Sequence, residues 1–149
     1  MGTHLKFTFL KKRWIIIEDL IKINKEEQDI NQLSPLTWAY VGDCVFELYI
    51  RTYLVDTTNL KPHKLHIESI KYVKASSQAG MLKNIYEDLT EEEKDIVRRG
   101  RNAENHHLPK NSNVQEYMYS TAFEALIGYL YLCGNTARVK EIIEKSLKM

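Results

Sequence analysis

The sequence predicts an all-α fold, and two observations carry that prediction. Apolar residues recur at steps of three and four along most of the 149-residue chain, which is the spacing of amphipathic helices. Segments in which apolar and polar residues alternate, as they do in half-buried strands, are absent from the sequence. The length fits one domain that can bury a core, built from about six to eight helices.

The composition is that of an ordinary globular protein, with 44% hydrophobic and 28% charged residues. The formal net charge is only +1, so any nucleic-acid binding must come from local clusters of charge. No apolar run approaches the roughly 18 residues that a membrane span requires. We therefore expect a cytoplasmic protein in which Cys44 and Cys133 are reduced core thiols.

Residues 1–30 are interpreted as an N-terminal extension, and residues 31–149 as the folded domain. Basic residues 11–13 precede apolar residues 14–17, which loosely resembles a secretory signal. Acidic residues 18 and 19 interrupt that pattern, and no small-residue cleavage site follows. The extension is an extra helix, a poorly ordered segment or the product of an early start codon, and we assign it no chemistry.

The first long helix is expected to begin at Ser34, a good N-cap residue, followed by Pro35 at the first helical position. Polar residues 56–59 would end it. Its expected apolar face recurs at steps of three and four and comprises Trp38, Val41, Val45 and Leu48.

Four further helical segments are expected. One begins at Pro62, has Ile67, Ile70 and Val73 on one face, and continues to residue 86 with a kink near residues 76–77. Thr90 and Glu93 form a capping box for the next, which would stop at Gly100 before a polar loop over residues 101–113. The last two span residues 114–132, ended by Gly134, and residues 136–147, whose apolar face holds Val139, Ile142, Ile143 and Leu147.

Two of these apolar helices carry a carboxylate where a core helix would normally hold an aliphatic residue. The two acids are Asp43 and Glu124. A buried carboxylate is costly unless something positive meets it. Gly42 and Gly128 would let the two helices cross closely and bring the acids together. Two converging carboxylates suit a hard divalent cation held by oxygen ligands.

Glu47 lies one helical turn after Asp43, so the two acids share a helix face. Two interpretations of Glu47 stay open. It supports the carboxylate site, or it pairs with Arg51, which lies one further turn along.

A basic cluster, Arg98–Arg101, stands at the expected end of the helix that begins after Thr90. Arginines at this position either complement the helix dipole or contact phosphates through their guanidinium forks. His106 and His107 follow, but no further Cys or His stands near them at zinc-ligand spacing.

Several segments, in order, resemble the ribonuclease III family. Residues 38–47 resemble its signature helix, which contains a Gly-Asp-x-Val core. Residues 123–128, Phe-Glu-Ala-Leu-Ile-Gly, resemble its second acidic motif. The Arg-Gly-Arg-Asn-Ala segment at 99–103, with residues 109–111 and 119–122, resembles Mini-ribonuclease III, the short bacterial branch with no separate double-stranded-RNA-binding domain. The resemblance covers residues 33–147, nearly the whole chain outside the extension.

The resemblance implies an all-helical ribonuclease III fold in a homodimer, whose signature helices pack together and form a cleft for double-stranded RNA. It implies Mg²⁺-dependent hydrolysis of phosphodiester bonds, with Mn²⁺ as a substitute, that leaves 5′-phosphate and 3′-hydroxyl ends. The implied substrate is the precursor of 23S ribosomal RNA. With so small a net charge, we also expect help from a partner such as a ribosomal protein.

Carried over by position, the resemblance makes Asp43 and Glu124 the catalytic metal ligands. It places Arg99, Arg101, Asn102 and Lys110 in contact with RNA, with Glu47 and Thr121 in supporting positions.

The sequence also departs from full-length ribonuclease III, because Ala39 and Thr121 stand where that enzyme carries two further acids. The number of metal ions per site therefore stays open. The missing acids would also fit a member of the family that only binds RNA, whereas the retention of Asp43 together with Glu124 favours an enzyme. A helical protein-interaction module would explain the amphipathic helices, but neither Gly42–Asp43 nor residues 99–102.

Overall fold

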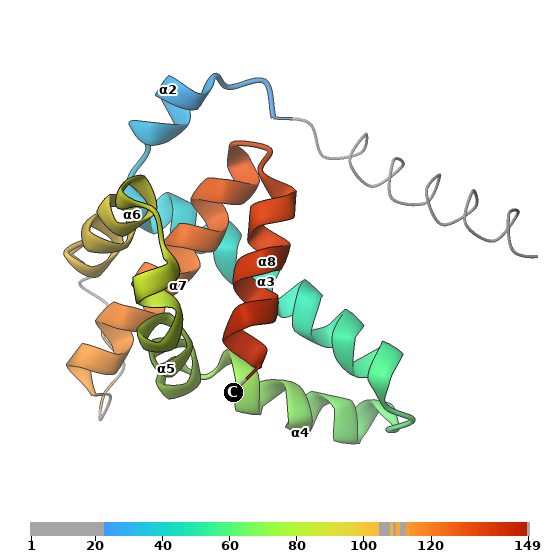
Figure 1. Cartoon of the computed structure of the whole chain (residues 1–149). Coiled ribbons are helices and arrows are strands. Elements are labelled where there is room, and N and C mark those ends of the chain that lie inside the picture. The colour runs from blue at the N-terminus through green and yellow to red at the C-terminus, as the bar shows by residue number, and fades with distance from the viewer. Residues whose placement is uncertain (1–22, 105–107, 109, 111–112, 149) are drawn as a thin grey trace, which may run out of the picture.

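The computed structural model describes residues 23–104, 108, 110 and 113–148, and these residues form helices and no strand (Figure 1). The predicted all-α class is thereby confirmed. No helix in this part of the chain has the length and apolarity needed to cross a membrane. Residues 1–22 and the His106–His107 pair lie outside the described residues. The elements are α2 (Glu27–Asn31), α3 (Pro35–Thr57), α4 (Pro62–Val73), α5 (Ala75–Ile85), the 3₁₀ helix η1 (Tyr86–Asp88), α6 (Glu91–Arg101), α7 (Val114–Leu132) and α8 (Thr136–Leu147).

Helix α7 is the centre of the fold. It packs most extensively against α3 and also contacts α5, α6 and α8. Phe123 on α7 is fully buried and meets Phe46 of α3 edge-on, with ring centroids 5.2 Å apart. The most apolar helix of the sequence is thus surrounded by the others, and residues on α7 are fixed by packing on several sides.

Local sequence sets the helix starts as expected. The Ser34 hydroxyl accepts a hydrogen bond from the backbone N–H of Leu36 at 3.3 Å, and Pro35 follows it. At α6 the capping box is complete: the Glu93 N–H donates to the Thr90 hydroxyl at 3.2 Å, and the Thr90 N–H donates to the Glu93 carboxylate at 2.9 Å. Each cap satisfies backbone donors that the first helical turn leaves free.

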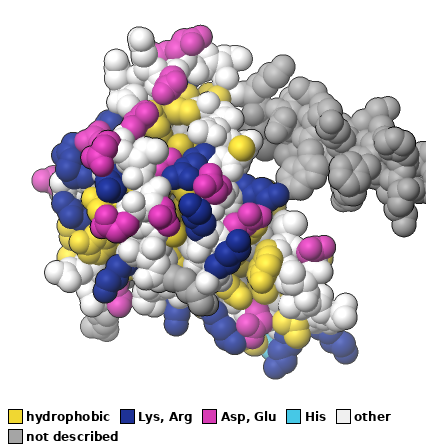
Figure 2. Space-filling model, in the orientation of Figure 1, with side chains coloured by type: hydrophobic (Ala, Val, Ile, Leu, Met, Phe, Trp, Pro, Cys, Tyr) yellow, Lys and Arg dark blue, Asp and Glu magenta, His cyan; other side chains and the backbone are white. Residues whose placement is uncertain are grey.

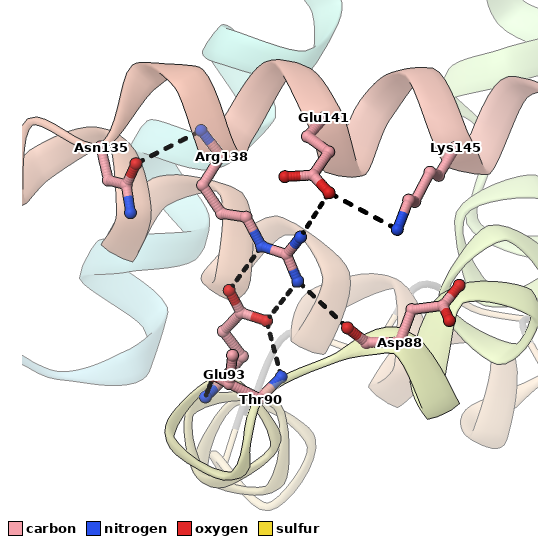
Figure 3. Close-up of polar contacts among 7 residues, drawn as sticks. All are labelled: Asp88, Thr90, Glu93, Asn135, Arg138, Glu141 and Lys145. Carbon is pink, nitrogen blue, oxygen red and sulfur yellow. Dashed lines mark hydrogen bonds and ion pairs between the residues drawn. The ribbon is translucent and has the colours of Figure 1, made fainter.

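An ion pair ties α6 to α8 (Figure 3). Arg138 donates from Nε and Nη2 to the two carboxylate oxygens of Glu93, at 2.8 and 2.9 Å, and from Nη2 to the Asp88 carbonyl at 3.1 Å. The Glu93 side chain is 8% exposed and that of Arg138 17% exposed. Burial opposes ionisation of Glu93, but the hydrogen bonds from Arg138 and Thr90 outweigh it and lower the pKa of Glu93.

Helix α2 covers one end of the core. Ile30 is buried, and its carbonyl accepts a hydrogen bond from the Trp38 indole at 2.8 Å. The Arg99 guanidinium donates to Asn31, to the carbonyl at 2.7 Å and to Oδ1 at 3.0 Å, and lies 4.5 Å from the centre of the Trp38 ring. Ile30, the last residue of the expected extension, is therefore part of the core.

The buried face of α3 differs in part from the expected one. Trp38 is buried as expected, and Val41 and Val45 are half-buried, but Leu48 is 66% exposed. Cys44 is exposed rather than a core thiol, while Cys133 is half-buried. The prediction is wrong for Leu48 because α3 is apolar on two sides, so periodicity alone does not say which side meets the core. The residues that α3 buries are Trp38, Ala39, Gly42, Phe46, Ile50 and Leu54.

Two other boundaries differ from the sequence expectation. The chain breaks into α4 and α5 at Lys74, whose backbone is extended, instead of bending near residues 76–77. Helix α6 continues through Gly100 to Arg101. A Cβ at Gly100 would lie 2.9 Å from the Ala125 Cβ, so this glycine permits close packing of α6 on α7 and does not end the helix.

Candidate metal centre

Helices α3 and α7 cross in backbone contact at Gly42 and Gly128. A Cβ built on Gly42 would lie 1.7 Å from the carbonyl oxygen of Glu124, and one built on Gly128 would lie 1.8 Å from the carbonyl oxygen of Trp38. Neither position has room for any side chain. The structure therefore contains the helix crossing that the two glycines predict. This crossing sets the spacing of the two acids that lie beside it.

The crossing brings Asp43 of α3 and Glu124 of α7 to one open cavity of about 190 Å³. Asp43 is exposed, contrary to the buried position that its apolar neighbours suggested, whereas Glu124 is half-buried. The two remaining positions of interest also line this cavity: Ala39 is 6% exposed, and Thr121 is 7% exposed. The other lining residues are Leu36, Tyr40 and Tyr117.

The two carboxyl groups resist carrying two negative charges together. Burial and the nearby charge of Asp43 raise the pKa of Glu124 to about 8. Although Asp43 is exposed as a residue, partial burial of its carboxyl group and the charge of Glu47 raise the pKa of Asp43. The interaction between the two side chains lowers the pKa of Asp43 and raises the pKa of Glu124, so Glu124 is the carboxyl group that keeps a proton more readily. A cation between them would replace that proton and relieve the repulsion.

The donor set fits a hard divalent cation such as Mg²⁺ or Mn²⁺, because both side chains offer carboxylate oxygens. Within the described part of the chain, no three His, Cys, Asp or Glu side chains converge as a ligand group. The remaining positions around a cation would therefore be taken by water or by oxygens of a bound phosphate, which Mg²⁺ accommodates readily.

The expected supporting residues are engaged elsewhere. Glu47 forms an ion pair with Arg51 one turn along α3, which was one of the two interpretations of this residue. The Thr121 hydroxyl donates to the carbonyl of Tyr117 at 3.0 Å. Glu47 therefore influences the site through its charge, and Thr121 by lining the cavity wall.

The four residues expected to contact RNA are not among those that line the cavity. Arg99 faces inward, where Asn31 and Trp38 hold its guanidinium. Arg101, at the end of α6, is half-buried and donates from Nε to the Asn102 side chain at 3.3 Å, while Lys110 is exposed. Their contact with RNA stays a prediction, and Arg99 has a structural task in holding α2.

One residue near the site was missed by the sequence analysis. Gln78 of α5 is 1% exposed, and its side chain lies close enough to Glu124 to favour the ionised form of that carboxyl group. The sequence spacing could have indicated that Gln78 is buried. Together with Met81, Leu82 and Ile85 it forms the i, i+3, i+4, i+7 pattern of one helix face, and these are the residues that α5 buries.

Comparison with known proteins identifies the family. The Ribonuclease III domain matches residues 36–135. Mini-ribonuclease 3 of Thermoanaerobacter sp. (strain X514) is 51% identical over 123 residues, which cover 83% of this chain and 87% of that protein. Mini-ribonuclease 3 of Staphylococcus aureus (strain NCTC 8325 / PS 47) is 47% identical over 124 residues, covering 82% and 92%. A crystal structure of a Fusobacterium nucleatum protein superimposes with a TM-score of 0.72 at 35% identity, covering 80% of this chain and 96% of that one. With this fold, and with two acids at the crossing of its signature helices, the chain belongs to the ribonuclease III family, in the Mini-ribonuclease 3 branch.

Proposed function

We propose that this protein is a metal-dependent endoribonuclease that cleaves double-stranded RNA. The observation that carries the proposal is the convergence of Asp43 and Glu124 in one open cavity at the α3–α7 crossing. Membership of the ribonuclease III family supports the same activity. A protein that only binds RNA would have no need of two carboxylates that repel each other beside a cavity.

In this proposal Asp43 and Glu124 hold the cation, which is Mg²⁺ or, as a substitute, Mn²⁺. When bound, the ion supplies a nucleophile from water at neutral pH and offsets negative charge on the phosphate. Asp43 is exposed, so its carboxylate would be open both to the ion and to the RNA backbone. Glu124, on the packed helix α7, would hold the ion in its ionised form. The products would carry 5′-phosphate and 3′-hydroxyl ends.

We infer that the active form is a homodimer. The side of α3 that does not meet the core exposes large apolar residues, with Tyr40 79%, Leu48 66% and Val55 64% exposed. Ile67 and Ile70 on the neighbouring helix α4 are 40% and 46% exposed. An apolar face of this kind is unfavourable in water and suits a second copy of the chain. Pairing through α3 would place two metal centres on one RNA-binding surface.

The proposed substrate is the double-stranded part of the 23S ribosomal RNA precursor, in the cytoplasm. Arg101, Asn102 and Lys110 would contact its phosphates. Arg99 would anchor the end of α6, which carries Arg101, through its hydrogen bonds to Asn31. Figure 2 shows acidic and basic side chains interspersed on the face it presents, in keeping with the net charge of +1. Affinity would then rest on a few local contacts, and a ribosomal protein could raise it by presenting the RNA.

The test is incubation with a long double-stranded RNA and Mg²⁺ at low salt, comparing the natural protein with Glu124→Gln. The natural protein should cleave, and Glu124→Gln should lose cleavage because a neutral amide is a poor ligand for Mg²⁺. Glu87→Gln is the matched control, since Glu87 is exposed in η1 and its replacement makes the same change of charge away from the cavity. Binding of RNA without cleavage, in both Mg²⁺ and Mn²⁺, would instead support a protein that only binds RNA.

A further inference from the structure

Gln78 is a polar residue on the buried face of α5, and its position is not explained by packing. Its neighbours on that face are Met81, Leu82 and Ile85, which belong to the core between α5 and α7. The side chain is 1% exposed, and its Nε2 atom is buried with no hydrogen-bond partner among the described residues. A buried amide donor without a partner is unfavourable, so a residue of this kind requires a reason.

The group that this donor can serve is the Glu124 carboxyl. The Gln78 side chain lies close enough to Glu124 to lower the pKa of that carboxyl group, against the larger effects of burial and of Asp43. Its Nε2 atom has no hydrogen-bond partner among the described residues, and α5 packs on α7, the helix that carries Glu124. The donor is therefore in place beside the carboxyl group without being engaged by it.

We propose that Gln78 is a positioning residue of the metal centre, whose Nε2 donates to one oxygen of the Glu124 carboxylate and leaves the other oxygen to the cation. The proposal rests on the proposed function, because it assigns Gln78 to the site that Asp43 and Glu124 form. Carboxylates that hold metals are commonly oriented by a hydrogen bond of this type. The donor comes from α5, so three helices would build the centre.

A purely structural role for Gln78 makes a different prediction. If the amide only filled space in the core, replacing it by an apolar side chain of similar length would leave cation binding unchanged. If it orients Glu124, the same replacement would weaken cation binding while leaving the metal-free fold at least as stable, because the amide it removes has no partner there.

The experiment titrates Mn²⁺ into the metal-free protein at pH 8, without RNA, and follows free Mn²⁺ by electron paramagnetic resonance. We expect Gln78→Met to raise the Kd for Mn²⁺ about tenfold, the size typical of losing a partner to a metal ligand. Thermal unfolding of the metal-free variant should give an unchanged or higher Tm. Gln78→Leu provides a second apolar variant, and Gln28→Met, at an exposed glutamine of α2, is the matched control.

An unchanged Kd in both Gln78 variants would overturn the proposal. So would a raised Kd accompanied by a lower Tm in both, because a packing defect would then account for the weaker binding. Cleavage of RNA by the natural protein separates the two hypotheses. If the natural protein cleaves and binds Mn²⁺ while the Gln78 variants bind it equally well, only the role of Gln78 fails. If it neither cleaves nor binds Mn²⁺, the proposed function fails and the role of Gln78 falls with it.

Discussion

Asp43 and Glu124 have the same functional group, but their surroundings give them different properties. Asp43 is exposed on α3 beside Glu47, whereas Glu124 lies half-buried on α7. Burial and the charge of Asp43 raise the pKa of Glu124 to about 8. The more buried acid therefore keeps a proton near neutral pH unless a cation replaces it, and the exposed acid is the one that solvent reaches.

This difference makes Asp43→Asn a test of chemistry rather than of folding. We expect cleavage to fall at least about 100-fold, because the variant loses one of two charged ligands. The metal-free fold should be as stable as the natural one or more so, since Asp43 is exposed and its charge repels Glu124. Single-turnover cleavage and thermal unfolding measure the two effects.

Asp56→Asn is the control for Asp43→Asn, because Asp56 is an exposed aspartate near the end of the same helix. It should cleave RNA like the natural protein. Retention of activity by Asp43→Asn would remove Asp43 from the metal centre.

At the scale of elements, the α3–α7 crossing determines where both acids lie. Gly42→Ala would place a methyl group 1.7 Å from the Glu124 carbonyl oxygen, so the two helices would have to move apart. We expect a loss of about 3 kcal/mol in the free energy of unfolding, at the upper end for overpacking of a core. Cleavage should fall as well, because separating the helices separates Asp43 from Glu124. Unfolding in urea measures the first effect.

Gly80→Ala offers a matched comparison for Gly42→Ala. Gly80 lies inside α5, and a Cβ there would meet nothing within 4 Å. The same change should stabilise the protein by about 0.5–1 kcal/mol, since alanine is the better helix former. Equal effects of the two substitutions would contradict a close crossing at Gly42.

The same element scale shows what sequence can and cannot predict here. The caps at Ser34 and Thr90 were predictable because their hydrogen bonds join residues two or three positions apart. The crossing at Gly42 and Gly128 was predictable because each glycine interrupts an apolar helix, Gly42 next to Asp43 and Gly128 one turn after Glu124. The buried side of α3 was not, because both sides are apolar and the choice depends on α7.

Long-range polar contacts were also beyond the sequence pattern. Arg138 and Glu93 are 45 positions apart, and Arg99 and Asn31 are 68 positions apart, so no helical spacing connects them. For Arg99 this matters to function, because the sequence left two roles open for the basic cluster, complementing the helix dipole and contacting phosphates. The structure shows that the Arg99 guanidinium instead packs on Trp38. Gln78 is an intermediate case, since its register was visible while its neighbour Glu124 was not.

At the scale of the whole molecule, a single chain brings the two acids together and buries a core, but it leaves an apolar surface exposed to solvent. Leu48 and Val55 on α3 point away from the core that α7 organises, and Ile67 and Ile70 on α4 are exposed as well. In Figure 1, the end of α3 and the start of α4 project from the other helices and meet at a corner, from which α4 runs back towards α5. A dimer that buries the apolar surface of these two helices would stabilise it, and the stability of the protein would then depend on its concentration.

The Asp43–Glu124 pair also predicts how the stability of the whole molecule depends on pH. The pKa of Glu124 rises from its ordinary value of 4.5 to about 8 on folding, and that of Asp43 is raised too. The folded chain therefore binds protons more tightly than the unfolded chain. Stability from this source is complete below about pH 4.5 and is lost as pH rises towards 8, a change on the order of a few kcal/mol.

Urea unfolding at pH 5 and pH 8, in EDTA and at one protein concentration, measures this dependence. The free energy of unfolding of Glu124→Gln should be markedly less sensitive to pH over that range. Comparing this variant with the natural protein cancels the contribution of the histidines. Glu87→Gln should keep the natural pH dependence. Mn²⁺ should restore stability at pH 8, by about 2.7 kcal/mol at a concentration 100 times its Kd. It should have little effect at pH 5, where protons compete for the same carboxylates. If the natural protein and Glu124→Gln show the same pH dependence, the pKa of Glu124 is not raised in the metal-free fold. The electrostatic reason for a cation at the crossing would then disappear.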